Sequence, residues 1–197
     1  NWFQGNADAV RKNIFHLNLK GDEEILVLSG DQLYEMDYRD LIHFHRKTKA
    51  DFTVSVVPIA SKEARDYGIL RVNSKARITG FIEKPKTPSA LKTFRPLRAS
   101  MGVYVFNART LARILNTSDA DFGSEVIPHS IRNFRGYAYL FNGYWKDVGM
   151  MKDFYAANID MASYKERFSF FYRGAIFTRP RFLPPARIAG ARIEDSL

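Results

Sequence analysis

Hydrophobic and polar residues alternate along this chain with two different periods, which together predict an α/β fold. Apolar runs rich in branched residues, such as 52–59 and 99–106, are typical of strands, whereas apolar positions three or four residues apart, as in 38–49, indicate amphipathic helices. Because strands and helical segments follow one another in turn, we expect a sheet with crossover connections. The strands are expected at 24–30, 52–59, 69–72, 77–82, 99–106 and 137–148, and the helices at 7–19, 38–49, 110–115, 123–133 and 151–162.

The strand at 24–30 has the most informative ending, because its apolar run stops at Ser29, Gly30 and Asp31. Runs of this kind are typical of buried strands in parallel sheets, and open α/β sheets bind ligands beyond the carboxyl ends of their strands. Asp31 is therefore a candidate ligand for a divalent cation that carries nucleotide phosphates. An Asp that only caps a turn fits the same pattern.

Asp147 is a second carboxylate at a strand end, since it follows an aromatic run and precedes Gly149. Two carboxylates from separate strands can meet over one site and hold a divalent cation. The alternative interpretation is that Asp31 and Asp147 are two unrelated turn residues.

Lys84, Glu83 and Ser100 are further candidates. Lys84 follows a strand and is fixed by Pro85, so that it offers a point charge for a phosphate. Glu83 can accept hydrogen bonds from sugar hydroxyls, and Ser100 opens a strand where it can donate to a ligand. In the structural alternative, Glu83 and Lys84 form an exposed ion pair and Ser100 caps a turn.

Composition narrows the class of protein further. The 197 residues are 46% hydrophobic, which is enough for one domain with a substantial core. The absence of cysteine excludes disulfides and thiolate metal sites, and the four histidines lack the spacing of a metal site. No G-x-S-x-G elbow, signal peptide or apolar run of membrane-spanning length occurs.

The formal net charge of +9 suits an anionic ligand. The basic residues are scattered among 21 acidic ones and form no block of five or more, so that most of this charge is expected at the solvated surface. The aromatic residues are not interleaved with basic ones as in a nucleic-acid platform. We therefore expect neither a nucleic acid nor a membrane as a partner.

Five motifs, in this order along the chain, resemble the ADP-glucose pyrophosphorylase (glucose-1-phosphate adenylyltransferase) family of sugar-nucleotide pyrophosphorylases. They are WFQGNADAV at 2–10, LSGDQLY at 28–34, FIEKP at 81–85, ASMGVY at 99–104 and YWKDVG at 144–149. The stretch at 177–185 is similar to the link between that family's catalytic domain and its left-handed β-helix. The resemblance implies a Rossmann-like nucleotidyltransferase domain with a mixed, mostly parallel sheet at 1–165, a linker at 166–187 and the start of a left-handed β-helix at 188–197.

The resemblance also implies an activity, namely formation of ADP-glucose and pyrophosphate from ATP and α-D-glucose 1-phosphate with Mg²⁺, in glycogen or starch biosynthesis. The implied site residues are Asp31 and Asp147 for the metal, Asp31 and Lys84 for catalysis, Gly68, Glu83, Lys84 and Ser100 for glucose 1-phosphate, and Gly5 and Asp8 for the nucleotide. A homotetramer in the bacterial cytoplasm is implied, or a heterotetramer if the protein is plastidial.

The chain departs from the family pattern at several positions. Asn6 stands where the family usually has Thr, Gln32 stands where it has His, and Met150 follows Gly149 where Thr is frequent. Because Asn6 and Gln32 remain polar, we expect these two changes to alter detail without loss of activity. The family's Gly-rich G-G-x-G-T-R-L loop does not occur in the sequence, so that we expect an internal part of a longer protein, inactive by itself.

Two alternatives remain open on the sequence. One is a pyrophosphorylase of another sugar nucleotide, such as GDP-mannose or UDP- or dTDP-glucose. The other is a non-catalytic regulatory subunit, against which the presence of Asp31, Lys84 and Asp147 argues.

Overall fold

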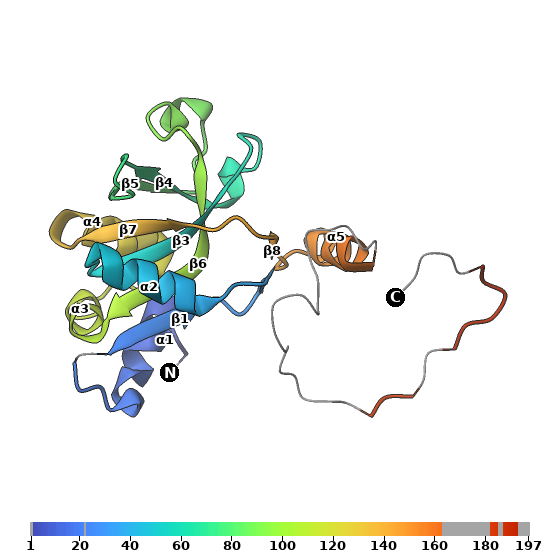
Figure 1. Ribbon diagram of the computed structural model, residues 1–197, viewed down its shortest axis with the longest axis horizontal. Coiled ribbons are helices and arrows are strands. Elements are labelled where there is room, and N and C mark those ends of the chain that lie inside the picture. Colours follow the sequence, from blue (N-terminus) through green and yellow to red (C-terminus); the bar gives the residue numbers. More distant parts are fainter. Residues whose placement is uncertain (1, 22, 163–181, 185–186, 193–197) are drawn as a thin grey trace. The chain divides into compact units, whose positions relative to one another are not determined.

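The computed structural model describes residues 2–21, 23–162, 182–184 and 187–192 (Figure 1). The chain divides into two units, one formed by residues 1–30 and 37–142 and the other by residues 31–36 and 143–197. Each unit has its own sheet, with six strands in the first and two in the second. No helix of the described residues combines the length and the hydropathy needed to cross a membrane.

The sheet of the first unit is organised around β6. Its strands are β1 (Glu24–Leu28), β3 (Phe52–Pro58), β4 (Gly68–Val72), β5 (Ile78–Glu83), β6 (Arg98–Asn107) and β7 (Gly136–Leu140). The order is β5-β4-β6-β3-β7, and β1 also pairs with β6. The ten residues of β6 therefore pair with three other strands.

The expectation of a mostly parallel sheet is wrong. β3 and β7 are parallel, whereas the pairs β1–β6, β3–β6, β4–β5 and β4–β6 are antiparallel. β1 is a half-buried strand that pairs only with β6 among the described strands, and Leu28 at its end is 42% exposed. An apolar run reports that a strand packs against a core, and it carries no information on the direction of the neighbouring strand.

Helices cover both faces of β3, which explains its continuous apolar run. Thr53 faces α2 (Tyr38–Thr48), whereas its neighbour Val54 packs with residues of the opposite face, because successive side chains of a strand alternate. The opposite face carries α1 (Asn6–Asn13), α3 (Ala108–Ile114) and α4 (Ile127–Asn133) (Figure 1). Six consecutive residues of β3 are buried as a result.

The predicted elements agree with the structure except at three places. The expected strand at 137–148 is two strands, β7 in the first unit and β8 (Trp145–Asp147) in the second. The expected helix at 7–19 ends earlier, since α1 is followed by a 3₁₀ turn, Ile14–Leu17. The expected helix at 123–133 is α4 preceded by a π-helical turn, η4 (Phe122–Val126).

The second unit contains β2 (Gln32–Tyr34), β8 and α5 (Met151–Ala162). Its described residues 182–184 and 187–192 form no helix or strand. The predicted linker at 166–187 and β-helix start at 188–197 lie largely outside the described residues, and both stay predictions.

His45 is a buried polar residue that links α2 to two strands. Its side chain is 2% exposed, and its ring nitrogens lie 2.8 Å from Thr53 Oγ1 and 3.1 Å from Asn107 Oδ1. Because the Asn107 amide donates to the Ala50 carbonyl, its oxygen is left to accept from His45 Nε2, and Nδ1 accepts from the Thr53 hydroxyl. Burial lowers the pKa of His45, so that the ring is held neutral.

We expect this arrangement to make the free energy of unfolding depend on pH. A histidine whose pKa is lowered by folding stabilises the protein above the ordinary value of 6.5, and this contribution is lost as the pH falls below that value. The substitution His45→Gln should cost about 1–3 kcal/mol at pH 7.5 through the lost buried hydrogen bonds. Urea unfolding of both proteins at pH 7.5 and pH 5 should show a smaller difference at pH 5; an equal difference at both pH values contradicts the neutral ring.

Candidate active site

The two candidate metal ligands lie on adjacent strand ends of the second unit. β2 and β8 are antiparallel with Gln32 opposite Asp147, and the Val148 amide donates to the Asp31 carbonyl at 3.0 Å. This last hydrogen bond extends the ladder past β2 to Asp31. The ladder therefore brings together two carboxylates that are far apart in the sequence.

Both carboxylates face Gly149. A Cβ atom at this position would stand 3.1 Å from Asp147 Oδ1 and 3.6 Å from Asp31 Oδ2. The glycine amide also donates to Asp147 Oδ1 at 2.9 Å, which fixes that carboxylate. The absence of a side chain leaves a space lined by two carboxylate oxygens.

This pair suits a cation that arrives with phosphates. Among the described residues, no group of three or more His, Cys, Asp and Glu side chains could hold a metal ion. Mg²⁺ is typically bound through one or two carboxylates together with substrate phosphates and waters, whereas dedicated sites of protein ligands alone are less frequent for it. Asp31 and Asp147 therefore fit a Mg²⁺ ion whose remaining ligands come from substrate.

Gln32 fixes this small ladder through its side chain. Its Oε1 accepts a hydrogen bond from Trp145 Nε1 at 3.1 Å. A ladder of three residue pairs is marginal in isolation, and a slip by one residue would turn Asp147 to the other face. Gln32, where the family pattern has His, thus retains an acceptor that helps to hold the register.

A second group of candidates surrounds Glu83 in the first unit. Gly68 is opposite Glu83 in the β4–β5 pair, and a Cβ atom on Gly68 would stand 2.6 Å from Glu83 Oε2. A Cβ atom on Gly123 would stand 3.1 Å from the same oxygen. The carboxylate therefore occupies space that two glycines leave free.

The groups around Glu83 are suited to a hydroxylated ligand. Burial raises the pKa of Glu83; Lys84 lowers it and Asp121 raises it further. Burial also raises the pKa of Tyr104 to about 12, and the charges of Asp121 and Glu83 contribute to this increase. The Tyr104 hydroxyl forms a hydrogen bond with Ser100. Two carboxylates and two hydroxyls thus lie in one neighbourhood, which offers both acceptors and donors to a sugar.

A bulge in β6 places Ser100 here. Val54 of β3 is opposite Tyr104 and Val56 is opposite Ser100, so that β6 uses two more residues than β3 over this interval. Gly102 takes up the irregularity with φ +67°, a conformation that favours glycine. On the other edge of β6, β1 pairs up to residue 103 and β4 pairs at residue 99. Ser100 therefore lies between the parts of β6 that pair with β1 and with β4.

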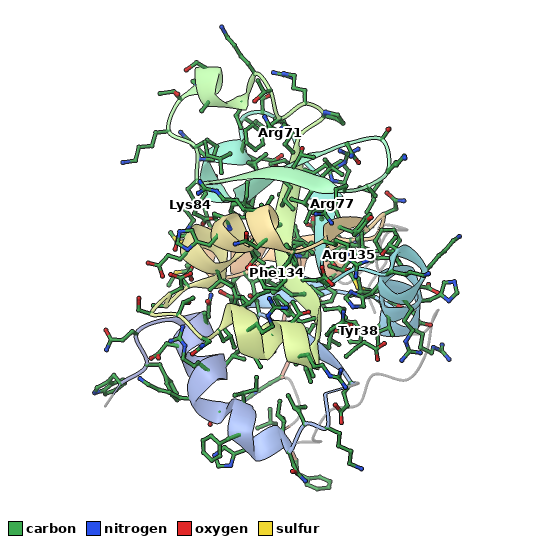
Figure 2. The ribbon with its side chains drawn as sticks, turned by 90° about the vertical axis from the view of Figure 1, so that its left-hand side faces the viewer. Tyr38, Arg71, Arg77, Lys84, Phe134 and Arg135 are labelled. Atoms are coloured by element: carbon green, nitrogen blue, oxygen red, sulfur yellow. The ribbon has the colours of Figure 1, made fainter. Side chains whose placement is uncertain are left out.

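Lys84 follows β5 in a left-handed backbone conformation, with φ +42°. Its amide donates to the Tyr67 carbonyl at 3.1 Å, and its exposed side chain forms no salt bridge with a described residue. Figure 2 shows Lys84 apart from Arg77 and Arg135. Asn18, Lys49 and Ala76 share this left-handed conformation, and the phosphate-binding role of Lys84 stays a prediction.

Gly5 and Asp8 make structural contacts at the start of α1. A Cβ atom on Gly5 would stand 2.9 Å from the Ala120 carbonyl carbon, so that only glycine allows this approach. Asp8 accepts from the Gln4 amide at 2.9 Å and from Lys12 at 2.7 Å, and these bonds lower its pKa. Both residues therefore have structural partners within the first unit, and their predicted contact with a nucleotide stays a prediction.

Three residues of the Glu83 group were missed in the sequence: Tyr104, Asp121 and Gly123. Asp121 and Gly123 flank Phe122 at the start of η4, which repeats the pattern of a carboxylate and a glycine before a helix that singled out Asp147. Tyr104 reads as a core aromatic, and only the structure shows its hydroxyl beside Ser100. The pair Asp31 and Asp147 belongs to the second unit, and the Glu83 group belongs to the first.

A comparison with known families accounts for this combination of residues. The family model described as nucleotidyl transferase matches residues 3–164, a range that contains every candidate site residue from Gly5 to Asp147. Together with the carboxylate pair at Gly149, the match shows that the chain belongs to the nucleotidyl transferase family.

Proposed function

We propose that this protein is a sugar-nucleotide pyrophosphorylase that forms ADP-glucose and pyrophosphate from ATP and α-D-glucose 1-phosphate. The observation that carries the proposal is the convergence of Asp31 and Asp147 on Gly149 in a member of the nucleotidyl transferase family. The choice of ADP-glucose among sugar nucleotides rests on the sequence resemblance, in particular on the motifs at 2–10 and 99–104.

In this reaction a phosphate oxygen of glucose 1-phosphate attacks the α-phosphorus of ATP. A new phosphorus–oxygen bond forms, and the bond from the α-phosphorus to the oxygen that bridges to the β-phosphorus breaks, so that pyrophosphate leaves. The nucleophile belongs to the substrate, which explains why a chain without cysteine or a serine elbow can catalyse the reaction. The protein contributes alignment and electrostatic stabilisation.

The residues divide these tasks by their chemistry. Asp31 and Asp147 would hold Mg²⁺, which neutralises the charge of the nucleotide phosphates when it is bound. Lys84 would bind the sugar phosphate as a point charge. Glu83 and Asp121 would accept hydrogen bonds from glucose hydroxyls, and Ser100 would donate to them, because these groups lie around the same space in the first unit.

The choice of nucleotide can be tested by measuring pyrophosphate release from glucose 1-phosphate with ATP, GTP, UTP and dTTP in the full-length protein. We expect kcat/KM for ATP to exceed the others by about tenfold or more, since a site that hydrogen-bonds one base leaves polar groups unpaired with another. Preference for another nucleotide would redirect the proposal to a different sugar nucleotide. No turnover with any of them would favour a regulatory subunit.

Removal of one metal-binding charge should abolish most of the activity. The substitution Asp31→Asn is expected to lower kcat/KM by about 10²–10³, as is typical for the loss of one group that stabilises the transition state. Binding of Mn²⁺, measured by the decrease of its free electron paramagnetic resonance signal, should weaken in parallel. The matched control is Asp153→Asn, which removes a carboxylate of the same unit that only pairs with Lys146 at 3.8 Å. Equal activity of the Asp31 variant and the wild type would refute the catalytic assignment.

We expect Glu83 to lower the thermal stability of the protein at neutral pH while it contributes to the binding of glucose 1-phosphate. Its folded pKa lies above the ordinary 4.5, so that folding is opposed once the pH exceeds this value and the buried carboxylate ionises. The substitution Glu83→Gln is therefore expected to raise Tm at pH 7.5, by a shift on the order of 2 °C, and to weaken glucose 1-phosphate binding. Thermal unfolding below pH 4.5 serves as the control, since the two proteins should then be equally stable. A lower Tm for the Gln variant at pH 7.5 would show that Glu83 is a structural residue.

A further inference from the structure

The start of α1 and the loop that carries Asp121 form one hydrogen-bonded assembly. Asn6 Oδ1 accepts from the Phe122 amide at 2.8 Å, over a sequence separation of 116 residues. The Ala120 carbonyl accepts from the Ala7 amide at 2.9 Å and from the Asp8 amide at 3.1 Å. The loop is therefore held by backbone and side-chain groups of the first helical turn.

Further contacts restrict the same loop. Arg11 donates to the Leu115 carbonyl at 2.8 Å and also to the Asp119 carbonyl. Glu125 accepts from the Ala120 amide at 2.6 Å. Glu125 also accepts from the Asp121 amide at 3.2 Å, and the next amide, that of Phe122, donates to Asn6.

Phe122 connects the loop to the Glu83 group. Its ring is buried and stacks on Tyr104 at a centroid distance of 5.4 Å. Asp121 and Gly123, on either side of it, are the loop residues that lie near Glu83. η4 continues from this point as a π-helical turn, a form that is frequent at functional sites because it redirects side chains. A displacement of the Phe122 backbone would therefore move both residues relative to Glu83.

We propose that Asn6 is a positioning residue for the Glu83 group, because it holds the Phe122 amide and hence Asp121 and Gly123 against Glu83. The inference rests on the proposed function of the Glu83 group. It assigns to the motif at 2–10, which the family resemblance associates with the nucleotide, a second task at the other substrate. The family pattern has Thr at this position, whose hydroxyl oxygen is also an acceptor.

Loss of the Asn6 acceptor should reduce the fraction of molecules that can bind glucose 1-phosphate. The substitution Asn6→Ala leaves the Phe122 amide without its partner, while Phe122 burial and the Ala120 bonds keep the loop in place on average. Apparent affinity falls in proportion to the competent fraction. The net contribution of one hydrogen bond corresponds to a loss of about three- to tenfold in affinity.

The experiment is calorimetric titration of the full-length protein with α-D-glucose 1-phosphate. We expect a three- to tenfold higher Kd for Asn6→Ala and near wild-type affinity for Asn6→Asp, which keeps the acceptor at the same place. The matched control is Asn73→Ala, because Asn73 Oδ1 likewise accepts from two backbone amides, those of Lys75 and Arg77, at the far end of the β4–β5 hairpin. It should lose stability and retain the affinity for glucose 1-phosphate.

The outcomes separate this inference from the function on which it rests. If the wild type does not bind glucose 1-phosphate, the proposed function fails. If the wild type binds and Asn6→Ala binds equally well, or if Asn6→Asp fails to restore binding, Asn6 is not a positioning residue. Hydrogen exchange of the wild type gives a second test that needs no variant. Glucose 1-phosphate should slow the exchange of backbone amides in residues 4–8 together with those in residues 120–124. Protection of residues 120–124 alone overturns the inference.

Discussion

The antiparallel pairing of β6 with three strands is the constraint on which the first unit depends. β3 occupies one edge of β6 along its whole length, and β1 and β4 share the other edge in succession. The register of β6 against β3 shifts between Ser100 and Tyr104, where Gly102 has a positive φ. This irregularity lies beside the Glu83 group, so that the pairing of β6 with β3 sets where Ser100 stands relative to Glu83.

His45 and Glu83 are two ionisable residues of the first unit with opposite consequences for folding. His45 satisfies both ring nitrogens with Thr53 and Asn107 and is buried as a neutral group, so that it links α2 to the sheet. Glu83 is half-buried between two glycines, and no hydrogen bond from a described residue to its carboxylate compensates the burial that raises its pKa. An unfavourable carboxylate of this kind is expected at a site whose ligand supplies the missing donors.

The local pattern of hydrophobic residues predicted the helices and strands well, and it predicted the pairing of the strands poorly. The periods of 38–49 and 52–59 reproduce α2 and β3 almost residue by residue, because helices and buried strands are defined by their own side chains. The direction of β1 and the division of 137–148 between two sheets depend on partners far away in the sequence, which no local period records. The ends of strands indicated Asp31, Asp147 and Glu83, whereas Asp121 precedes a helical turn, and its position near Glu83 depends on tertiary contacts such as that of its loop with Asn6.

Two of the positions at which the chain departs from the family pattern, Asn6 and Gln32, share a physical role. Asn6 accepts a hydrogen bond from the amide next to Asp121, and Gln32 accepts one from the indole two residues before Asp147. In each case an uncharged acceptor fixes a backbone segment that carries a carboxylate, and it touches no part of the carboxylate itself. The family residues Thr and His also present a neutral acceptor at these positions. Substitution is then tolerated where an acceptor within reach of the same donor is kept, which explains how a nucleotidyl transferase can change these side chains while it retains Asp31, Lys84 and Asp147.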